Sequence, residues 1–225
     1  MRRARRATLP PRPRPGPARR RRLVIFAKEP RAGRVKTRLG REIGMTVAAA
    51  WHRRRATELA RRMAAAPGWE CWLALSPDAA VRESPLWPAR ARRMGQGRGD
   101  LGRRMARVFR AGPPGPVVVI GADVPAIARA DVAAAFRALG PADAVIGPAA
   151  DGGYWLIGLR RSPRRAPLGL FEGVRWSTEH ARADTEATLR GAGAPMRIAR
   201  LIELRDVDRA ADLAPAARER ARRRL

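Results

Sequence analysis

The sequence predicts an α/β layer fold with a mostly parallel sheet. Short apolar runs, which are typical of buried strands, alternate along the chain with stretches whose apolar residues recur at helical spacing. The segment 116–120 (PVVVI) is the most strand-like, because it is apolar throughout, as in a parallel strand covered on both faces. The length of 225 residues fits one sizeable domain, or at most two small ones.

Short apolar runs predict the strands. The first run, 23–27, leads directly into a Pro/Gly loop, and the run at 90–94 is the weakest because arginine dominates it. The predicted strands are 23–27, 70–75, 90–94, 116–120, 144–147, 154–159 and 196–203.

Helices are predicted between these strands. The longest, 43–66, ends at Pro67-Gly68, and its helical period is carried by Val47, Ala50, Trp51, Leu59 and Met63. The others are predicted at 99–111, 129–139, 178–191 and 209–224. In open α/β sheets ligands bind beyond the carboxyl ends of the strands, where the strand order reverses, so the loops after three of the strands are the candidate site.

The positive charge is concentrated at the N-terminus. The chain carries 48 Lys and Arg against 20 Asp and Glu, a net charge of +28, and the ten arginines of residues 1–22 account for ten of these charges. This tail is rich in proline and has no apolar period, so we expect it to be disordered. It could be a nucleic-acid arm, a targeting sequence or, as we prefer, the product of a misassigned start codon. The apolar run 23–27 is too short for a signal peptide.

Composition excludes several classes of protein. The remaining arginines are spread over the predicted helices without interleaved aromatics, so we interpret them as a solvated surface and expect no specific nucleic acid. No apolar run approaches the 18 residues of a membrane span, which predicts a cytoplasmic protein. The single cysteine, Cys71, excludes an internal disulfide and lies in an apolar run, where a buried thiol is expected.

Both lysines of the chain lie in one loop. Lys28 and Lys36 follow the first predicted strand, and every other basic residue is arginine. A compact ammonium on a flexible stem suits phosphate groups in a way that a planar guanidinium does not reproduce. The loop is not a Walker A motif, because Val35 stands where that motif requires glycine. The alternative is a basic surface turn.

Carboxylates follow the later strands. Asp123 comes just after 116–120, where a carboxylate needs a cation or a hydrogen-bond donor, or caps the next helix. Asp151 stands beside two glycines that let backbone amides approach a ligand, although an ordinary turn is an equal alternative. Asp206 and Asp208 lie on the same side of an extended segment and suit a metal, although Asp208 could instead cap the last helix.

Two other candidates are set aside. The segment 97–102 satisfies the G-x-G-x-x-G pattern, but the arginine-rich run before it is not the buried strand that a dinucleotide fingerprint requires. Neither histidine is expected to be catalytic, because His52 and His180 lie on predicted helices among arginines.

Six ordered motifs resemble one family. They are Phe26-Ala27-Lys28 with Pro30, Gly33 and Val35-Lys36-Thr37-Arg38-Leu39; Gly99-Asp100-Leu101-Gly102 with Arg104-Met105; Gly121, Asp123 and Pro125; Gly147-Pro148 with Asp151-Gly152-Gly153-Tyr154; Trp176-Ser177-Thr178; and Asp206-Val207-Asp208. Over about residues 23–213 the chain resembles the bacterial "transferase 1, rSAM/selenodomain-associated" family, also described as arsenosugar-biosynthesis-type glycosyltransferases. That family is similar to GT-A nucleotide-diphospho-sugar transferases and to the guanylyltransferase of deazaflavin cofactor synthesis.

The resemblance implies a fold and a set of roles. The fold would be a single-domain GT-A-like three-layer sandwich over 23–213, between the tail 1–22 and a basic helix end at 214–225. Lys36, Asp123 and Asp151 would be catalytic, and Asp123, Asp206 and Asp208 would hold Mg²⁺ or Mn²⁺. The nucleotide would contact Phe26, Ala27, Lys28, Gly33, Lys36, Thr37, Arg38, Gly99 and Asp100. The acceptor would contact Gly152, Gly153, Tyr154, Trp176, Ser177 and Thr178.

The chain departs from the family pattern at two positions. The family's usual Gly-Ser-Asp-Cys-Pro reads Gly-Ala-Asp-Val-Pro around Asp123, and the position before Asp151, often acidic in relatives, is Ala150. The second departure could alter the acceptor.

The resemblance implies a metal-dependent transferase that joins a nucleotide-activated donor to a small-molecule acceptor. A glycosyltransferase is the first hypothesis, and a nucleotidyltransferase that releases pyrophosphate is the second. A basic nucleic-acid-binding protein is the remote alternative, and the oligomeric state is not predicted.

Overall fold

A computed structural model of the chain describes residues 21–160, 169–191 and 196–223. Its described part contains a seven-stranded sheet of order β3-β2-β1-β4-β6-β5-β7. All neighbouring strands are parallel except β6, which is antiparallel to both β4 and β5. The strands are β1 (Arg22–Lys28), β2 (Glu70–Ser76), β3 (Arg92–Gly95), β4 (Val117–Gly121), β5 (Ala144–Pro148), β6 (Tyr154–Leu159) and β7 (Ile198–Arg200). The prediction of an α/β fold with a mostly parallel sheet is confirmed.

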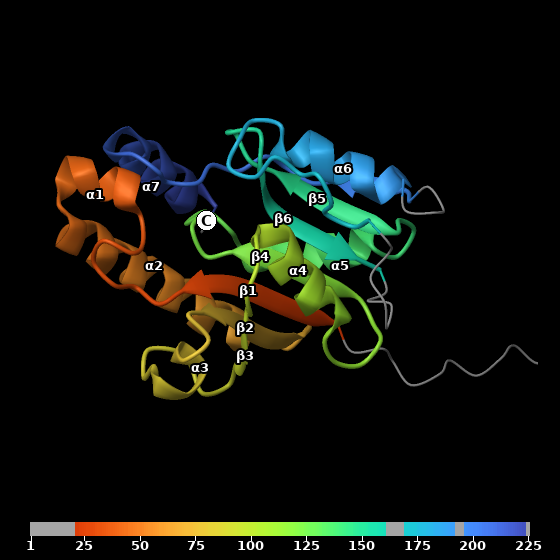
Figure 1. Cartoon of the computed structure of the whole chain (residues 1–225), viewed down its shortest axis with the longest axis horizontal. Helices are drawn as coiled ribbons and strands as arrows, with labels where there is room; N and C mark the ends of the chain where they lie inside the picture. Colours follow the sequence, from red (N-terminus) through yellow and green to blue (C-terminus); the bar gives the residue numbers. More distant parts are fainter. Residues whose placement is uncertain (1–20, 161–168, 192–195, 224–225) are drawn as a thin grey trace, which may run out of the picture.

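Helices cover both faces of the sheet and one of its ends. They are α1 (Thr37–Ile43), α2 (Met45–Ala64), α3 (Ala80–Glu83), α4 (Leu101–Arg110), α5 (Arg129–Ala138), α6 (Ala181–Gly191), the short 3₁₀ helix η1 (Ala210–Asp212) and α7 (Leu213–Arg222). In Figure 1 the arrowhead of β1 points toward the end of the molecule where α1, α2 and α7 gather.

Successive residues of the strands are buried on opposite faces of the sheet, so the sheet lies between two layers of helices. Leu23 and Ile25 of β1 pack with α2 and α5, whereas Val24 packs with α4 on the opposite face. Such continuous burial of successive residues requires a strand with both faces covered. A third, smaller cluster of Leu39, Ala48, Val207 and Ala216 joins α1, α2 and α7.

The first helical region differs from its prediction. A single helix over 43–66 was expected, but Gly44, with φ 94°, separates α1 from α2. The predicted apolar face is also wrong at Val47, which is 57% exposed, and at Ala50, which is exposed. The buried face of α2 instead follows small residues such as Ala48 and Ala56, which allow close packing.

Several other boundaries move by a few residues. Arg22, assigned to the tail, is the buried first residue of β1. The strand expected at 196–203 is reduced to β7, and the helix expected from 178 begins at Ala181. The final helix, expected from 209, divides into η1 and α7. Residues 1–20, and with them nearly all of the tail, lie outside the described residues.

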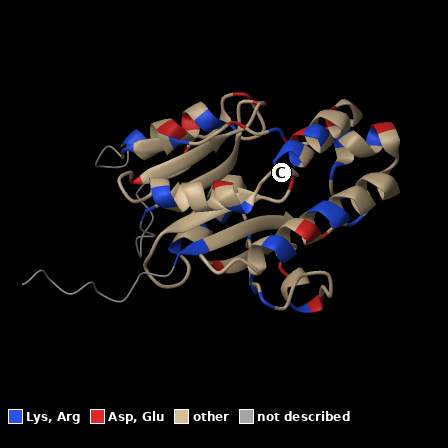
Figure 2. Ribbon diagram, turned by 180° about the vertical axis from the view of Figure 1, so that it is seen from behind, with Lys and Arg blue, Asp and Glu red and all other residues tan. Residues whose placement is uncertain are grey.

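The surface matches the compositional expectations. Lys and Arg are spread over the helices rather than gathered in one stripe (Figure 2). Within the described ranges, no helix combines the length and apolar character needed to cross a membrane. Cys71 is 5% exposed, and burial raises the pKa of its thiol to about 12, so the predicted buried thiol is confirmed.

Candidate functional site

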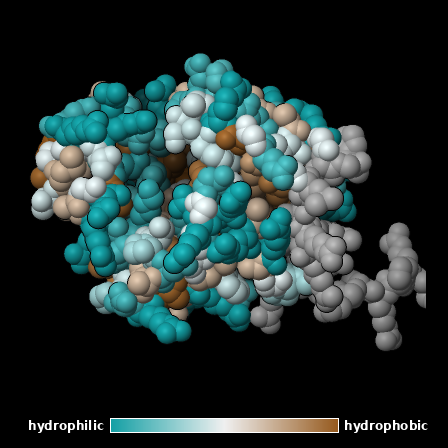
Figure 3. Space-filling model, in the orientation of Figure 1, coloured by the Kyte–Doolittle hydropathy of each residue, from teal (hydrophilic) through white to brown (hydrophobic). Residues whose placement is uncertain are grey.

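The candidate site lies where the strand order reverses. The first strand, β1, lies between β2 and β4, with β2 and β3 on one side of it and β4, β6, β5 and β7 on the other, so the strand order reverses at β1. Lys28 is the last residue of β1, and Asp123 lies two residues beyond the end of β4. The position predicted from strand order is therefore the position observed. Figure 3 shows that the face seen in Figure 1 is hollowed between the end formed by α1 and α7 and the rest of the molecule.

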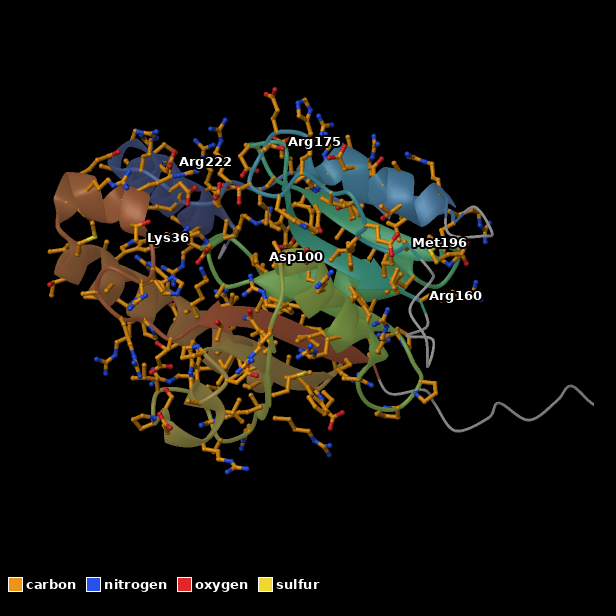
Figure 4. All side chains as sticks on the ribbon, viewed as in Figure 1. Lys36, Asp100, Arg160, Arg175, Met196 and Arg222 are labelled. Atoms are coloured by element: carbon orange, nitrogen blue, oxygen red, sulfur yellow. The ribbon has the colours of Figure 1, made fainter. Side chains whose placement is uncertain are left out.

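Lys36 connects the two acidic segments of the site. Its side chain is 4% exposed, and its Nζ lies 3.3 Å from Oδ2 of Asp123 and 3.0 Å from Oδ1 of Asp208. Burial alone lowers the pKa of this ammonium, but the charges of Asp123 and Asp208 outweigh it and raise the pKa above its ordinary value. Lys36 immediately precedes α1 in the left-handed conformation, with φ 46° and ψ 45°, which a non-glycine residue rarely adopts. Figure 4 shows it near the first turn of α1.

Asp123 is held through both of its carboxylate oxygens. Oδ2 faces Lys36, and Oδ1 lies 3.2 Å from Nδ1 of His52 on α2. Burial raises the pKa of this carboxyl, but the Lys36 ammonium and the His52 imidazole together hold it well below its usual range. The side chain still keeps 49% of its surface open, so the carboxylate is oriented by the protein and accessible to a ligand.

Asp206 and Asp208 face the same cluster, as their alternation predicted. Val207 between them is fully buried in the core that joins α1 and α7. Asp208 contacts both Lys36 and Arg38, whose Nη1 is 3.1 Å from Oδ2. Burial and then the charge of Asp208 raise the pKa of Asp206 to about 6. The segment therefore presents acidic groups that repel one another around one ammonium.

The donor chemistry of this cluster fits a hard divalent cation. Carboxylate oxygens of Asp123, Asp206 and Asp208 are the ligands that Mg²⁺ and Mn²⁺ accept, and such ions also retain waters and take substrate phosphates. A fully formed protein cage is absent, since the described residues contain no group of three or more His, Cys, Asp or Glu arranged to hold a metal.

A hollow of about 460 Å³ lies beside the lysine loop. Its lining carries the cations Lys28, Arg31 and Arg34 and one acidic residue, Glu29, together with Ser76 and Pro77 at the end of β2. Gly33 turns this loop with φ 72°, and a Cβ there would meet no atom within 4 Å. The two lysines therefore have different surroundings: Lys36 is enclosed by carboxylates, and Lys28 is exposed at the hollow.

The other predicted nucleotide contacts lie around the same strand ends. Phe26 and Ala27 belong to β1, and Thr37 and Arg38 begin α1. Asp100 caps α4, since its Oδ1 accepts the backbone N–H of Arg103 at 2.8 Å, and Gly99 precedes it with φ 108°. Figure 4 shows Asp100 at the start of α4. The structure thus gives Asp100 a definite capping role.

Gln96 adds a polar link that the sequence did not indicate. It is 3% exposed, and its amide Nε2 donates to the backbone oxygens of Ala27 and Ala74. Its Oε1 accepts from Nη1 of Arg104 at 3.0 Å. This side chain ties the ends of β1 and β2 to α4.

The residues predicted to bind the acceptor gather in one region. Asp151 accepts the N–H of Gly153 at 2.9 Å and contributes, with its charge, to the raised pKa of Asp206. Gly152 has φ 83°, and a Cβ there would lie 2.3 Å from the carbonyl oxygen of Glu179. The loop 151–153 therefore packs against the backbone of Glu179, the residue that follows the turn 176–178.

Aromatic packing fixes the inner side of that region. The rings of Tyr154 and Trp176 meet edge to face with centroids 6.5 Å apart, and Trp176 also packs on Phe171. Ser177 adopts φ 62°, and Thr178 donates its hydroxyl to the carbonyl of Arg175. Ring packing at Trp176 and the hydrogen bond at Thr178 thus hold residues 176–178 in one turn conformation.

The sequence interpretation missed His52. It was set aside as not catalytic because it lies on a helix among arginines, but it is 3% exposed and contacts Asp123. A usable signal existed, because His52 is four residues from both Ala48 and Ala56 and so shares their buried helix face. A histidine on a buried face needs a polar partner. His180, by contrast, has a half-exposed side chain and lies in the turn just before α6 rather than on the helix where it was expected.

Comparisons with known proteins agree with this fold. The family of uncharacterized proteins conserved in bacteria (DUF2064) matches residues 58–178. A solved structure from Desulfovibrio desulfuricans G20, described as a candidate nucleotide-diphospho-sugar transferase, is 30% identical, with 84% of this chain and 82% of that chain covered and a TM-score of 0.72. No curated protein matches the chain.

Two structures of known enzymes share the fold at low identity. CMP:2-keto-3-deoxy-manno-octonic acid synthetase in complex with CTP is 14% identical, with coverage of 90% and 99% and a TM-score of 0.53. The 4-diphosphocytidyl-2C-methyl-D-erythritol synthase of Anaerococcus prevotii DSM 20548 is 10% identical, with coverage of 92% and 97% and a TM-score of 0.55. The predicted nucleotide-diphospho-sugar transferase fold is confirmed, whereas the narrower rSAM/selenodomain-associated group stays a prediction.

Proposed function

The chain belongs to the DUF2064 family, and from its fold and site we propose that it is a metal-dependent transferase that uses a nucleotide-activated donor. In the first form of the proposal it is a glycosyltransferase acting on a small-molecule acceptor. The observation that carries the proposal is the contact of Lys36 with Asp123 and Asp208 at the reversal of strand order. A cation and oriented carboxylates at that point suit the diphosphate of a nucleotide.

The donor would lie along the lysine loop. The hollow lined by Lys28, Arg31 and Arg34 would receive the nucleotide, because three cations there have an exposed surface for its phosphates. Asp123, with Asp206 and Asp208, would hold Mg²⁺ or Mn²⁺, which when bound neutralises phosphate charge. Asp123 is suited to this because its low pKa keeps it ionised at neutral pH.

Lys36 would act on the leaving phosphate. Its ammonium already lies between two carboxylates. If a phosphate displaced one of these carboxylates, the ammonium would keep an anionic partner. Charge on a departing phosphate is the main feature to stabilise in transfer from a nucleotide donor, and a fixed ammonium does so without reorganisation. Asp151, exposed beside the turn 176–178, would meet the acceptor and is the candidate base.

Nucleotidyl transfer is the second candidate. The same fold occurs in CMP:2-keto-3-deoxy-manno-octonic acid synthetase, and the same ammonium and carboxylates would serve the leaving pyrophosphate. The two reactions differ in the bond that breaks: between sugar and phosphate in one case, and between the α- and β-phosphates in the other.

A thermal-shift panel tests the proposal. Nucleotide sugars and nucleoside triphosphates with Mn²⁺ are compared at moderate salt on the wild type, Asp123→Ala and the control Glu83→Gln, which removes an exposed carboxylate on α3. Stabilisation by a nucleotide sugar that is lost only in Asp123→Ala supports glycosyl transfer. A response to triphosphates alone, with release of pyrophosphate, supports nucleotidyl transfer.

The same panel can contradict both candidates. Absence of any metal-dependent response to a nucleotide would exclude them. Affinity for nucleic acid that falls steeply with salt and persists in Asp123→Ala would favour the remote alternative of a basic nucleic-acid-binding protein.

A further inference from the structure

His52 is buried on α2 in a space between two alanines that is large enough for an imidazole ring. It is 3% exposed on a 20-residue helix, and the residues one turn before and one turn after it are Ala48 and Ala56, both fully buried. Small neighbours at these positions leave room for an imidazole to lie against the helix and reach toward the loop after β4. Its Nδ1 lies 3.2 Å from Oδ1 of Asp123.

The contact with Asp123 distinguishes this ring from a packing residue. Both ring nitrogens are enclosed, and neither makes a well-aligned hydrogen bond with the residues that the structure describes. The 3.2 Å separation nevertheless places Nδ1 within hydrogen-bond distance of the carboxylate oxygen. An apolar side chain would fill the space without the cost of enclosing two polar atoms.

The carboxylate of Asp123 is therefore contacted at both oxygens by residues from two different parts of the chain. His52 approaches Oδ1 from α2, and Lys36 approaches Oδ2 from the start of α1. A carboxylate that accepts at one oxygen from a fixed ring has its plane and rotamer set, and its other oxygen keeps a defined direction.

We propose that His52 is a positioning residue that donates its Nδ1–H to Oδ1 of Asp123 and so directs Oδ2 toward Lys36 and the ligand of the site. Donation requires the proton on Nδ1, because an unprotonated Nδ1 would bring its lone pair against the carboxylate oxygen. This is not the tautomer that neutral histidine prefers in water. The consequence for metal and nucleotide rests on the proposed function, whereas the hydrogen bond itself does not.

The tautomer is measurable because the chain has two histidines. In tag-free His180→Gln protein, His52 is the one remaining imidazole, and its ¹⁵N and ¹H resonances in a long-range correlation spectrum report which nitrogen carries the proton. A proton on Nδ1, in the neutral ring or the imidazolium, is the expected result, with a changed spectrum once Asp123→Ala removes the acceptor. An unprotonated Nδ1, or a spectrum unaffected by Asp123→Ala, would overturn the proposal.

A pair of substitutions tests the consequence for binding. His52→Asn keeps an N–H near the position of Nδ1, and His52→Leu fills the same space without a donor; His180→Leu is the matched control on the surface. We expect His52→Leu to weaken Mn²⁺-dependent nucleotide binding by about 10- to 100-fold, the usual effect of losing a partner of a metal ligand, and His52→Asn to stay within about threefold of wild type. Equal losses in both variants would show that His52 acts through packing alone.

The two proposals fail separately. If the wild type binds no nucleotide with any metal, the proposed function fails, and the tautomer of His52 still decides whether it positions Asp123. If the wild type binds but His52→Leu binds equally well, the function stands and the positioning role does not.

Discussion

Replacing Lys36 is the perturbation for which the structure makes the sharpest prediction. In Lys36→Met a side chain of similar length stays in the same enclosed position, but Asp123 and Asp208 lose the ammonium that lies 3.3 and 3.0 Å from them. The charge of Asp206 then adds to the repulsion, because its carboxyl interacts with both of the others. The backbone strain of the left-handed conformation is unchanged, since methionine adopts it no more readily than lysine.

The size of the effect follows from the exposure of the partners. Removing one partner of a fully buried ion pair costs about 3–5 kcal/mol. The ammonium is 4% exposed, but the carboxylates are 49% and 39% exposed, so water solvates much of the charge that is left behind. We therefore expect a loss of about 1–2 kcal/mol in the free energy of unfolding. For a chain of this size that lowers Tm by about 2–8 °C.

The substitution Lys36→Arg tests whether the site needs only a positive charge or also the compact shape of an ammonium. The positive charge is kept, but a planar guanidinium does not fit where a compact ammonium is 4% exposed between two carboxylates. We expect a smaller loss of Tm than in Lys36→Met, and at least tenfold weaker nucleotide binding in both variants. Arg41→Met, which removes an exposed charge from the same helix, is the control and is expected to leave both quantities unchanged.

Differential scanning calorimetry and nucleotide titration together decide this prediction. Wild-type nucleotide affinity in Lys36→Arg would refute the argument that the site needs a lysine. An unchanged or raised Tm in Lys36→Met would refute the electrostatic role of its ammonium.

The remaining predictions concern other parts of the fold. Gly152→Ala should lower the free energy of unfolding by about 1–3 kcal/mol and impair acceptor binding, because its Cβ would lie 2.3 Å from a backbone oxygen at φ 83°; the control Gly68→Ala, where a Cβ meets no atom within 4 Å, should be nearly neutral in the same thermal melt. Cys71 should resist a thiol reagent at pH 8 until denaturant is added, because its pKa is raised to about 12; rapid labelling of the native protein would contradict the buried thiol. Arg182, Arg190 and Arg200 contact Glu186. Burial raises the pKa of its carboxyl, but the hydrogen bonds and charges of Arg200 and Arg190 outweigh burial and lower the pKa. Its stabilisation is therefore complete above the unfolded-state pKa of about 4.3 and is lost as the pH falls through the lower folded pKa, so Glu186→Gln should lower Tm at pH 7 and reduce the fall of Tm between about pH 5 and pH 2. Equal pH dependence in Glu186→Gln and wild type would contradict this.

The sequence was most informative at the ends of strands. Buried parallel strands are apolar throughout, so β1 and β4 and the polar residues that follow them, Lys36 and Asp123 among them, could be placed by pattern alone. Asp206 and Asp208 were also oriented correctly, because the alternation of an extended segment is fixed by its geometry.

Other features depend on contacts between distant segments. The contact of His52 with Asp123 joins α2 to the loop after β4, which no local pattern encodes. The left-handed conformation of Lys36 could not be predicted from the sequence either, because lysine rarely adopts it and only the surrounding packing holds it there. The split at Gly44 had a signal, but a glycine within a helical pattern is often tolerated.

Calorimetric titration of nucleoside diphosphates and their sugar conjugates, with and without Mn²⁺, tests the central claim most directly. Wild type and Asp123→Ala are compared at a salt concentration high enough to screen the net charge of +28. The account predicts binding by the wild type that requires Mn²⁺ and is lost in Asp123→Ala. Binding that is equal without metal, or equal in Asp123→Ala, would contradict a metal-dependent nucleotide site built on Lys36 and Asp123.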